Sequence, residues 1–247
     1  NEGKEGLPRS LLLSLIASKQ AWGSNTPNQN IITAVIGATT IGGMDLTEEY
    51  FKTKKSIQTL EHHPCSVITD YLSEYFQLDE FKTTISTACS SSANAIMLGA
   101  RMIKNNLADR VLVEGGDALT HFTVNGFNSL RIYASELCKP FDNNRNGLNL
   151  GEAAACVVLE NEKSISITKN KKIATVIGWG NANDAFHQTA SSPNGEGAQK
   201  AMKLALKEAD LNPSDIDYIN AHGTSTELND KNELLNSAGI ILENDIM

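Results

Sequence analysis

Features that mark several large classes of protein are missing from the 247 residues of this sequence. Its four cysteines include no CxxC pair and no disulfide-dense spacing, which indicates a reducing compartment, and we expect a cytoplasmic protein. No signal peptide is visible, and the uncharged run 83–100 is interrupted by Thr, Ser and Asn, so it indicates a buried strand and helix rather than a membrane span. The formal net charge of -8 argues against a nucleic-acid-binding surface, which is normally basic.

Patterns typical of metal and phosphate sites are also missing. The segment 62–65 (His-His-Pro-Cys) is too compact for a zinc site, and no second pair of ligands follows it. Gly42 and Gly43 follow a strand-like run, but no GxGxxG or P-loop pattern surrounds them, so tight turns explain these glycines better. We therefore expect neither a metal nor a bound nucleotide.

What the sequence does contain is an alternation of helix-like and strand-like segments, which predicts an α/β protein. Apolar residues at helical spacing predict helices over 7–22, 93–102 and 198–209, and helices are also expected over 47–54 and 66–76. Buried apolar runs predict strands over 31–37, 81–86, 110–116, 153–160, 173–178 and 216–220. The strand–helix–strand unit over 81–116 predicts a parallel sheet. A lysine-rich turn at 169–172 predicts a boundary between two halves, residues 1–165 and 166–247.

Cys89 lies where a predicted strand ends and a predicted helix begins. A thiol there is close to the positive end of the helix dipole, which favours the thiolate. The neighbours Ala88, Ser90 and Ser91 are small and leave room for a substrate, as in a nucleophile elbow. Cysteine is also among the most buried residue types, so a core thiol is the alternative. Its position alone leaves both interpretations open.

A second polar stretch follows the last predicted strand. His222 could donate a hydrogen bond to a developing oxyanion, and Thr224 and Thr226 could bind the amides of a long substrate arm. Asp230 and Glu233 follow, one helical turn apart. These carboxylates could orient a base or pair with a lysine, or they could belong to a solvated helix face.

A turn-rich loop over 138–152 lies between the two polar stretches. Asp142 and Arg145 could pair across one of its turns and hold its shape. An ordinary surface turn accounts for the same residues equally well, so the residues alone assign this loop no chemistry.

Taken in order, three motifs resemble the elongating β-ketoacyl-acyl-carrier-protein synthases of the thiolase-like superfamily. They are Thr-Ala-Cys-Ser-Ser at 87–91, the Pro-Phe-Asp…Arg…Gly…Gly-Glu loop at 140–152, and His-Gly-Thr-Ser-Thr at 222–226. The segment 184–197 looks like the part of the same family that lies between the last two motifs, and the resemblance covers about residues 7–233. Four matches in the right order and spacing make this a specific signal.

The resemblance implies a layered α-β-α-β-α thiolase-like fold, built from two similar halves, and a homodimer, with a heterodimer of related subunits as the alternative. It implies decarboxylative condensation of an acyl thioester with a malonyl thioester, in fatty-acid or related polyketide or polyene synthesis. The substrates would arrive on the phosphopantetheine arm of acyl carrier protein, and no metal or redox cofactor would be needed. Cys89 matches the acyl-accepting nucleophile, and His222 matches the first of two histidines that stabilise the malonyl-derived enolate.

The remaining matches concern the substrate arm and its surroundings. Thr224 and Thr226 match threonines that hydrogen-bond the phosphopantetheine arm, and Thr189 matches a residue of the same tunnel. Asp230 and Glu233 match carboxylates that interact with a lysine of the family.

The sequence also departs from the family pattern. The family has a strand and a Gly-rich turn before the part that matches Leu7, and a lysine, a second histidine and a Phe-Gly-rich gate loop after the part that matches His222. We expect these segments in a longer protein, of which this sequence is a part; the alternative is a truncated homologue, or a non-catalytic partner subunit that shapes a heterodimer's tunnel. Cys89 argues against such a partner, which typically lacks the nucleophile, and His222 in its motif argues against a thiolase-fold hydrolase or starter-type synthase.

Overall fold

The computed structural model describes residues 6–54, 57–187 and 191–242, with side chains up to Ser237. The chain forms two compact units, residues 1–125 with 151–173 (unit 1) and residues 126–150 with 174–247 (unit 2). These units interleave along the chain, and the predicted boundary between halves at 165 and 166 stays a prediction. Within the described residues, no helix has the length and apolar character that crossing a membrane requires.

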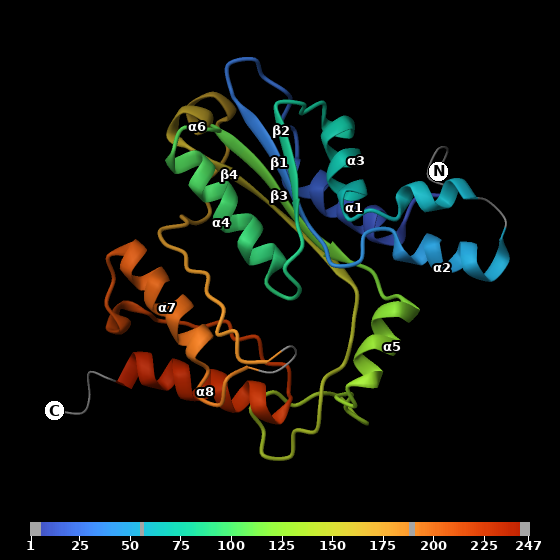
Figure 1. Ribbon diagram of the computed structural model, residues 1–247. Coiled ribbons are helices and arrows are strands. Elements are labelled where there is room, and N and C mark those ends of the chain that lie inside the picture. The colour runs from blue at the N-terminus through green and yellow to red at the C-terminus, as the bar shows by residue number, and fades with distance from the viewer. Residues whose placement is uncertain (1–5, 55–56, 188–190, 243–247) are drawn as a thin grey trace. The chain divides into compact units, whose positions relative to one another are not determined.

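Unit 1 is organised around a sheet of four strands in the order β2-β1-β3-β4 (Figure 1). The strands are β1 (Thr33–Ala38), β2 (Phe81–Ile85), β3 (Arg110–Asp117) and β4 (Ala153–Glu160). β1 runs parallel to both β2 and β3, whereas β4 pairs with β3 in the antiparallel direction. The parallel sheet predicted from the 81–116 unit is confirmed, but β1 lies between β2 and β3, which the sequence did not predict. The carboxyl ends of β1, β2 and β3 therefore meet at one edge, where α/β sheets place their ligands.

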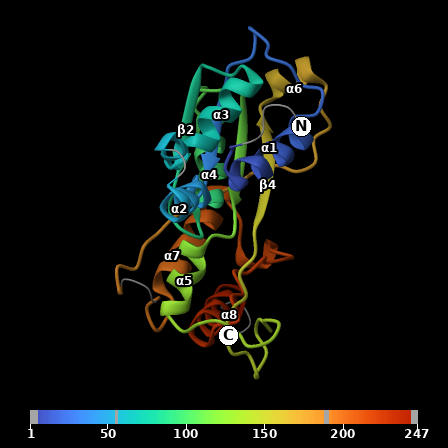
Figure 2. The ribbon, with the colours of Figure 1, turned by 90° about the vertical axis from the view of Figure 1, so that its right-hand side faces the viewer.

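Helices cover both faces of this sheet. They are α1 (Arg9–Trp22), α2 (Met44–Thr53), α3 (Ser66–Phe76), α4 (Ser91–Lys104) and α6 (Glu162–Thr168), with a 3-10 helix η1 (Ile57–His62). α1 lies alongside β4 (Figure 2) and packs with α3 against one face, and α4 packs against the other. A further helix, α5 (His121–Ser129), follows β3. The helices predicted over 7–22, 47–54, 66–76 and 93–102 are all present.

The two faces of β1 contribute to two separate hydrophobic clusters. Val35 packs with Leu11 and Leu72 of α1 and α3, whereas the next residue, Ile36, packs with Ala95 of α4. This alternation is what the two-residue period of a strand dictates. Each fully buried aliphatic side chain contributes about 1.5–3 kcal/mol, so the central strand anchors both layers of helices.

Glycine in the middle of α4 has a packing role. A β-carbon at Gly99 would lie 3.0 Å from Leu159 and 3.2 Å from Val113. Because glycine weakens a helix interior, its presence here is explained by the close approach of α4 to β3 and β4. The helix was predicted as buried, but its buried residues form only a stripe that faces the sheet, namely Ser91, Ala95, Gly99 and Met102.

β4 differs from its prediction in the same way. The run 153–160 was predicted as a buried strand, but burial alternates along it, and Val157 is 42% exposed. β4 is an edge strand of the described sheet: α1 covers one of its faces, while α4 packs mainly on the inner strands. An apolar run therefore does not by itself indicate burial on both faces.

Unit 2 contains residues 126–150, which include the end of α5, together with α7 (Glu196–Ala209), a 3-10 helix η2 (Pro213–Asp215) and α8 (Glu227–Leu242). The helix predicted over 198–209 is confirmed as α7. The strands predicted over 173–178 and 216–220 are wrong, since neither segment pairs with another described strand. Ile173 is 94% exposed and Tyr218 is 79% exposed. A strand needs a hydrogen-bonded neighbour, and β-branched composition cannot supply one.

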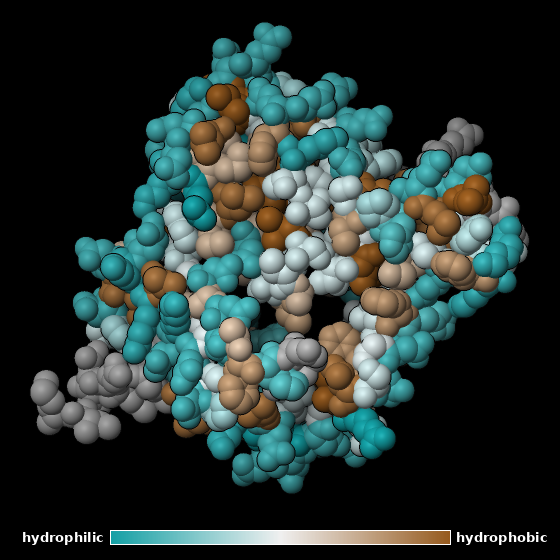
Figure 3. Space-filling view, viewed as in Figure 1, coloured by the Kyte–Doolittle hydropathy of each residue, from teal (hydrophilic) through white to brown (hydrophobic). Residues whose placement is uncertain are grey.

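Exposed apolar side chains also occur on α2 and η1 of unit 1. Figure 3 shows apolar and polar residues interspersed over these elements, and the most exposed of them are Phe51 and Ile57, each 64% exposed. Lys54 partly covers this region, because its ammonium lies 4.3 Å from the ring centre of Phe51 and 4.9 Å from that of Tyr50.

Candidate functional site

Cys89 lies in a tight turn between β2 and α4. The residue before it, Ala88, has a φ of +54°, in the left-handed region that side chains rarely adopt. Two serines close the turn: Ser91 Oγ accepts from Thr87 N at 2.8 Å and donates to Ala88 O at 2.7 Å, and Ser90 Oγ donates to Thr87 O at 2.7 Å. The turn therefore holds a strained backbone just before the helix, as a nucleophile elbow does.

The exposure of the Cys89 side chain decides whether it is an accessible thiol or a core thiol. Cys89 is exposed, whereas the other three cysteines are partly buried. It is therefore not a core thiol. It precedes the first residue of α4, Ser91, by two positions, where the unsatisfied amides of a helix begin. Its role as the acyl-accepting residue stays a prediction.

Asp117, at the carboxyl end of β3, was not anticipated. Its carboxylate accepts hydrogen bonds from the hydroxyl of Thr39 and, at 2.9 Å and 2.7 Å, from the amide and hydroxyl of Thr40. These bonds hold the turn after β1 against the end of β3. The signal in the sequence was an aspartate directly after the paired glycines that end a strand.

Glu152, at the end of the loop motif, belongs to unit 1 and connects three of its segments. Both carboxylate oxygens accept from Arg9 Nε at 2.8 Å, and one accepts from Leu119 N at 3.1 Å. The hydrogen bonds from Arg9 are the main reason why the pKa of Glu152 falls to about 2. This carboxylate fixes the entry to β4 relative to the start of α1.

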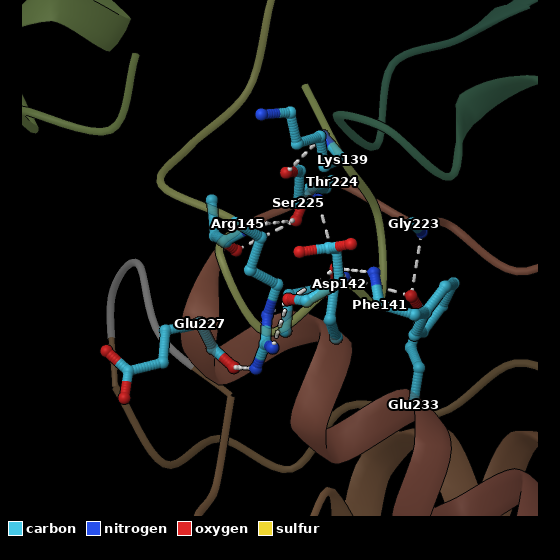
Figure 4. A network of polar contacts seen from close by, with 12 residues as sticks. Lys139, Phe141, Asp142, Arg145, Gly223, Thr224, Ser225, Glu227 and Glu233 are labelled. Carbon is cyan, nitrogen blue, oxygen red and sulfur yellow. Dashed lines mark hydrogen bonds and ion pairs between the residues drawn. The ribbon is translucent and has the colours of Figure 1, made fainter. Parts of the chain in front are cut away.

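In unit 2, Glu233 holds the backbone around His222. The amide of His222 donates to one carboxylate oxygen of Glu233 at 2.6 Å. The amide of Gly223 donates to the other at 2.7 Å (Figure 4). Gly223 has a φ of +56°, which glycine adopts without strain. A bidentate acceptor on α8 thus fixes the main chain that carries the exposed imidazole.

Asp230, one turn earlier on α8, is 1% exposed. Its carboxylate accepts from Phe141 N at 2.7 Å and Ser225 N at 3.0 Å, and lies 3.7 Å from Arg145 Nε. The solvated helix face that the sequence left open is therefore wrong for Asp230. Among the described residues its cationic partner is an arginine of the 138–152 loop, where the family resemblance had implied a lysine.

Arg145 connects the loop to α8 by contacts that the sequence did not predict. Its guanidinium donates to the carbonyl of Asp142 at 2.9 Å and to that of Glu227 at 3.0 Å. The pairing with the Asp142 carboxylate, one of the two alternatives that the sequence left open, is not the contact that forms, because that carboxylate accepts from Asn144 N at 2.6 Å. Arg145 still holds the shape of the turn, but through a backbone oxygen (Figure 4).

Ser225 completes the contact between the two segments. It is fully buried with a φ of +64°, its hydroxyl accepts from Lys139 N at 2.9 Å, and its carbonyl accepts from Gly147 N at 3.1 Å. On either side of it, the hydroxyls of Thr224 and Thr226 lie 2.8 Å apart and share a hydrogen bond. The 139–147 loop, the 222–226 segment and the start of α8 thus form one polar network.

The predicted site residues are divided between the units. The structure brings five of them together in unit 2, namely His222, Thr224, Thr226, Asp230 and Glu233. Cys89 belongs to unit 1. Thr189 lies outside the described residues. In the part of the chain that the structure describes, no three His, Cys, Asp or Glu side chains are grouped so that they could hold a metal ion.

The fold and these motifs place the chain among α/β proteins of the thiolase-like fold. The family model for the N-terminal domain of beta-ketoacyl synthase matches residues 9–164, and that for the C-terminal domain matches residues 173–245. The chain belongs to the beta-ketoacyl synthase family, which confirms the predicted resemblance.

Relatives with curated names agree with this assignment. The chain is 35% identical over 154 residues to the 3-oxoacyl-[acyl-carrier-protein] synthase 2 of Staphylococcus aureus, covering 60% of this chain and 38% of the relative. It is 34% identical over 225 residues to the putative mitochondrial 3-oxoacyl-[acyl-carrier-protein] synthase of Schizosaccharomyces pombe, covering 85% and 53%. The matched part is thus about half or less of each relative's length.

Solved structures show the same likeness. The ketosynthase ApeO in complex with its chain length factor ApeC, from Xenorhabdus doucetiae, aligns with a TM-score of 0.77 at 31% identity, over 94% of this chain and 57% of that one. The ishigamide ketosynthase/chain length factor aligns with a TM-score of 0.87 at 25% identity, over 96% and 61%. The predicted thiolase-like fold is confirmed by these neighbours.

Proposed function

We propose that this protein is a condensing enzyme, which joins an acyl thioester to a malonyl thioester with loss of carbon dioxide. The observation that carries the proposal is the exposed Cys89 in a strained turn at the start of α4, in a chain that belongs to the beta-ketoacyl synthase family. Fatty-acid or related polyketide synthesis is the setting that the names of its relatives support.

The first half-reaction stores the acyl group on Cys89. The thiolate attacks the carbonyl of the acyl thioester, a new carbon–sulfur bond forms, and the carrier thiolate leaves and takes the proton that Cys89 gave up. The amides at the start of α4 favour the negative sulfur. The small side chains of Ala88 and Ser90 leave the thiol accessible.

The second half-reaction makes the new carbon–carbon bond. The malonyl carboxylate leaves as carbon dioxide, and its bonding electrons form an enolate whose oxygen accepts a hydrogen bond from His222. One such donor contributes on the order of a hundredfold or more in rate. The enolate carbon attacks the acyl group on Cys89, and the cysteine thiolate leaves as the β-ketoacyl thioester forms. Decarboxylation itself generates the carbanion, so no strong base is needed.

The binding site proposed for the substrate arm belongs to the same polar network. Thr224 and Thr226 present hydroxyls beside His222, and such hydroxyls can bind the amides of a phosphopantetheine arm. Thr189 is proposed for the same arm on the strength of the family resemblance. The proposed partners are acyl carrier protein and a second synthase subunit, either identical or related.

A non-catalytic partner subunit is the second candidate. Two of the similar structures are ketosynthases with a chain length factor. This supports the role of a non-catalytic subunit as the alternative. The exposed Cys89 favours the catalytic role, because a subunit that only shapes a tunnel has no need of an accessible thiol in a strained turn.

Intact-mass spectrometry after incubation with an acyl-carrier-protein thioester tests the proposal. We expect one added acyl group on the wild-type protein and none on Cys89→Ala. The matched control is Cys138→Ala, which removes another partly accessible thiol and should leave the adduct unchanged. An adduct that persists in Cys89→Ala, or no adduct on the wild type, would favour the non-catalytic subunit.

A further inference from the structure

The centre of the unit 1 sheet contains a carboxyl group that the proposed chemistry does not use. Glu114 lies in the middle of β3, is 0% exposed, and pairs in register with Gly37 of β1 and Cys156 of β4. Neither of its carboxyl oxygens has a hydrogen-bond partner of good geometry among the described residues. A buried charge without a partner is strongly unfavourable, so this side chain is held in its neutral form.

Space for this side chain is made by glycine. A β-carbon at Gly116 would lie 2.8 Å from Glu114 Oε1 and 2.6 Å from Ser14 Oγ of α1. A β-carbon at Gly37 would lie 3.7 Å from Glu114 Oε2. The carboxyl group is thus enclosed by the main chain at Gly37 and Gly116 and by Ser14 of α1.

The next residue of β3 faces the other way and contacts the proposed nucleophile's helix. A β-carbon at Gly115 would lie 2.2 Å from Ser92 Oγ, in the first turn of α4 and three residues after Cys89. The strand segment 115–116 is therefore confined between the Glu114 side chain with Ser14 on one face and the start of α4 on the other. A shift of this segment must move one of them.

We propose that Glu114, in its neutral form, is a positioning residue for Cys89: it holds the end of β3 against the first turn of α4, and its ionisation releases that contact. Ionisation would require water or a countercharge to reach the carboxylate, and opening such a path would displace Ser14 or the 115–116 main chain, which lie against it. The inference rests on the proposed function, because it concerns the residue that would carry the acyl group.

The groups around Glu114 determine the pH at which its carboxyl group ionises. Burial raises the pKa of Glu114 from 4.5 to about 8; the Ser14 hydroxyl and the Ala38 main chain oppose this rise in part, and the Asp117 charge adds to it. Among the described residues, the titratable groups that act on it are Cys156 of β4, whose pKa burial raises to about 12, and Asp117 of β3, which acts through its charge. Among the described residues, α1 presents hydroxyls and β1 and α3 present glycine and threonine at this site, namely Ser14, Ser18, Gly37 and Thr69.

The sign of the effect on stability follows. Between the unfolded pKa of 4.5 and the folded pKa of about 8, the native protein holds a proton that the unfolded chain has lost. Stability therefore falls as the pH rises through this interval, and Glu114→Gln, which is neutral at every pH, should abolish that part of the slope.

The test measures how fast iodoacetamide alkylates Cys89, by peptide mass spectrometry, from about pH 6 to about pH 9.5, the interval that spans the titration. The ratio of the wild-type rate to the Glu114→Gln rate cancels the thiol's own ionisation. We expect this ratio to be constant below about pH 7 and to change by about threefold or more by about pH 9. Glu74→Gln, which removes an exposed carboxylate of α3, serves as the control and should give a flat ratio.

Urea unfolding over the same pH interval provides the second measurement. One outcome is that the wild type loses stability with rising pH, Glu114→Gln does not, and the alkylation ratio still stays flat. In that case Glu114 titrates without affecting Cys89, and the proposal is overturned. If neither measurement depends on Glu114, it is overturned as well. Alkylation needs no substrate, so either failure leaves the acyl-adduct test of the proposed function unaffected.

Discussion

Replacing Asp230 with alanine is expected to destabilise the protein by about 3–5 kcal/mol, the usual effect of removing one member of a buried charged pair. The carboxylate is the common acceptor for the amides of Phe141 and Ser225, and it lies beside the Arg145 guanidinium. Without it, two amides lose their acceptor and Arg145 loses its countercharge, in a region that water reaches poorly.

Fluorescence can report this loss within unit 2. The sequence has two tryptophans, Trp22 in unit 1 and Trp179 in unit 2, so urea unfolding in a Trp22→Phe background follows unit 2 through Trp179. Asp230→Asn keeps one acceptor oxygen and should lose less. Asp142→Asn, at an exposed carboxylate of the same loop, should change stability by less than about 0.5 kcal/mol. Equal effects of the 230 and 142 variants would show that the network does not stabilise the unit.

Arg110→Ala is expected to cost about 3–5 kcal/mol, because it empties the largest fully buried side-chain volume of the described chain. The Arg110 guanidinium lies 4.3 Å from the ring centre of Trp22, and it donates to Thr33 Oγ1 and to the carbonyl of Thr26, both at 3.2 Å. Burial lowers the pKa of Arg110, and the charge of Glu160 opposes this only in part.

Arg110→Met separates packing from charge at this position. Methionine refills most of the volume and removes the cost of burying a cation, so we expect the loss to be below about 1.5 kcal/mol. Trp22 fluorescence in a Trp179→Phe background measures both variants. A loss for Arg110→Met as large as that for Arg110→Ala would mean that the cation–π contact and hydrogen bonds, not packing, hold this end of the sheet.

Local patterns in the sequence were sufficient for most elements of unit 1. Apolar spacing over 7–22 and 93–102 corresponds to α1 and α4, because an amphipathic stripe needs only one buried face to form a helix. The parallel direction of β2 and β3 followed from the strand–helix–strand order over 81–116, whereas the place of β1 between them did not. These features depend on residues that are close in the sequence.

Features that depend on distant residues were missed. The runs 173–178 and 216–220 have the composition of strands but no described strand beside them, and composition cannot reveal a missing neighbour. The same holds for Asp230, whose burial results from a loop some ninety residues earlier, with Phe141 as partner at a separation of 89 positions. Glu114 lay inside a correctly predicted strand, but only the glycines and Ser14 around it show that its carboxyl is enclosed.

For the candidate site, the order of the motifs in the sequence identified the family. Only the structure showed which elements and side chains hold these motifs in place. His222 and Cys89 were predicted from their places after strand-like runs; the preceding strand exists for Cys89 but not for His222. In place of a strand, the carboxylate of Glu233 holds the backbone of His222. A carboxylate eleven residues later on a helix gives no signal of that contact in the sequence.

The most direct test of the central claim is a condensation assay of the purified protein with acyl-carrier-protein and malonyl-carrier-protein thioesters. The account predicts a β-ketoacyl thioester two carbons longer than the acyl substrate, released with carbon dioxide, with no product from Cys89→Ala and a fall of about a hundredfold or more for His222→Ala. Wild-type protein that binds both carriers but forms no product, or product that is unaffected by Cys89→Ala, would contradict it.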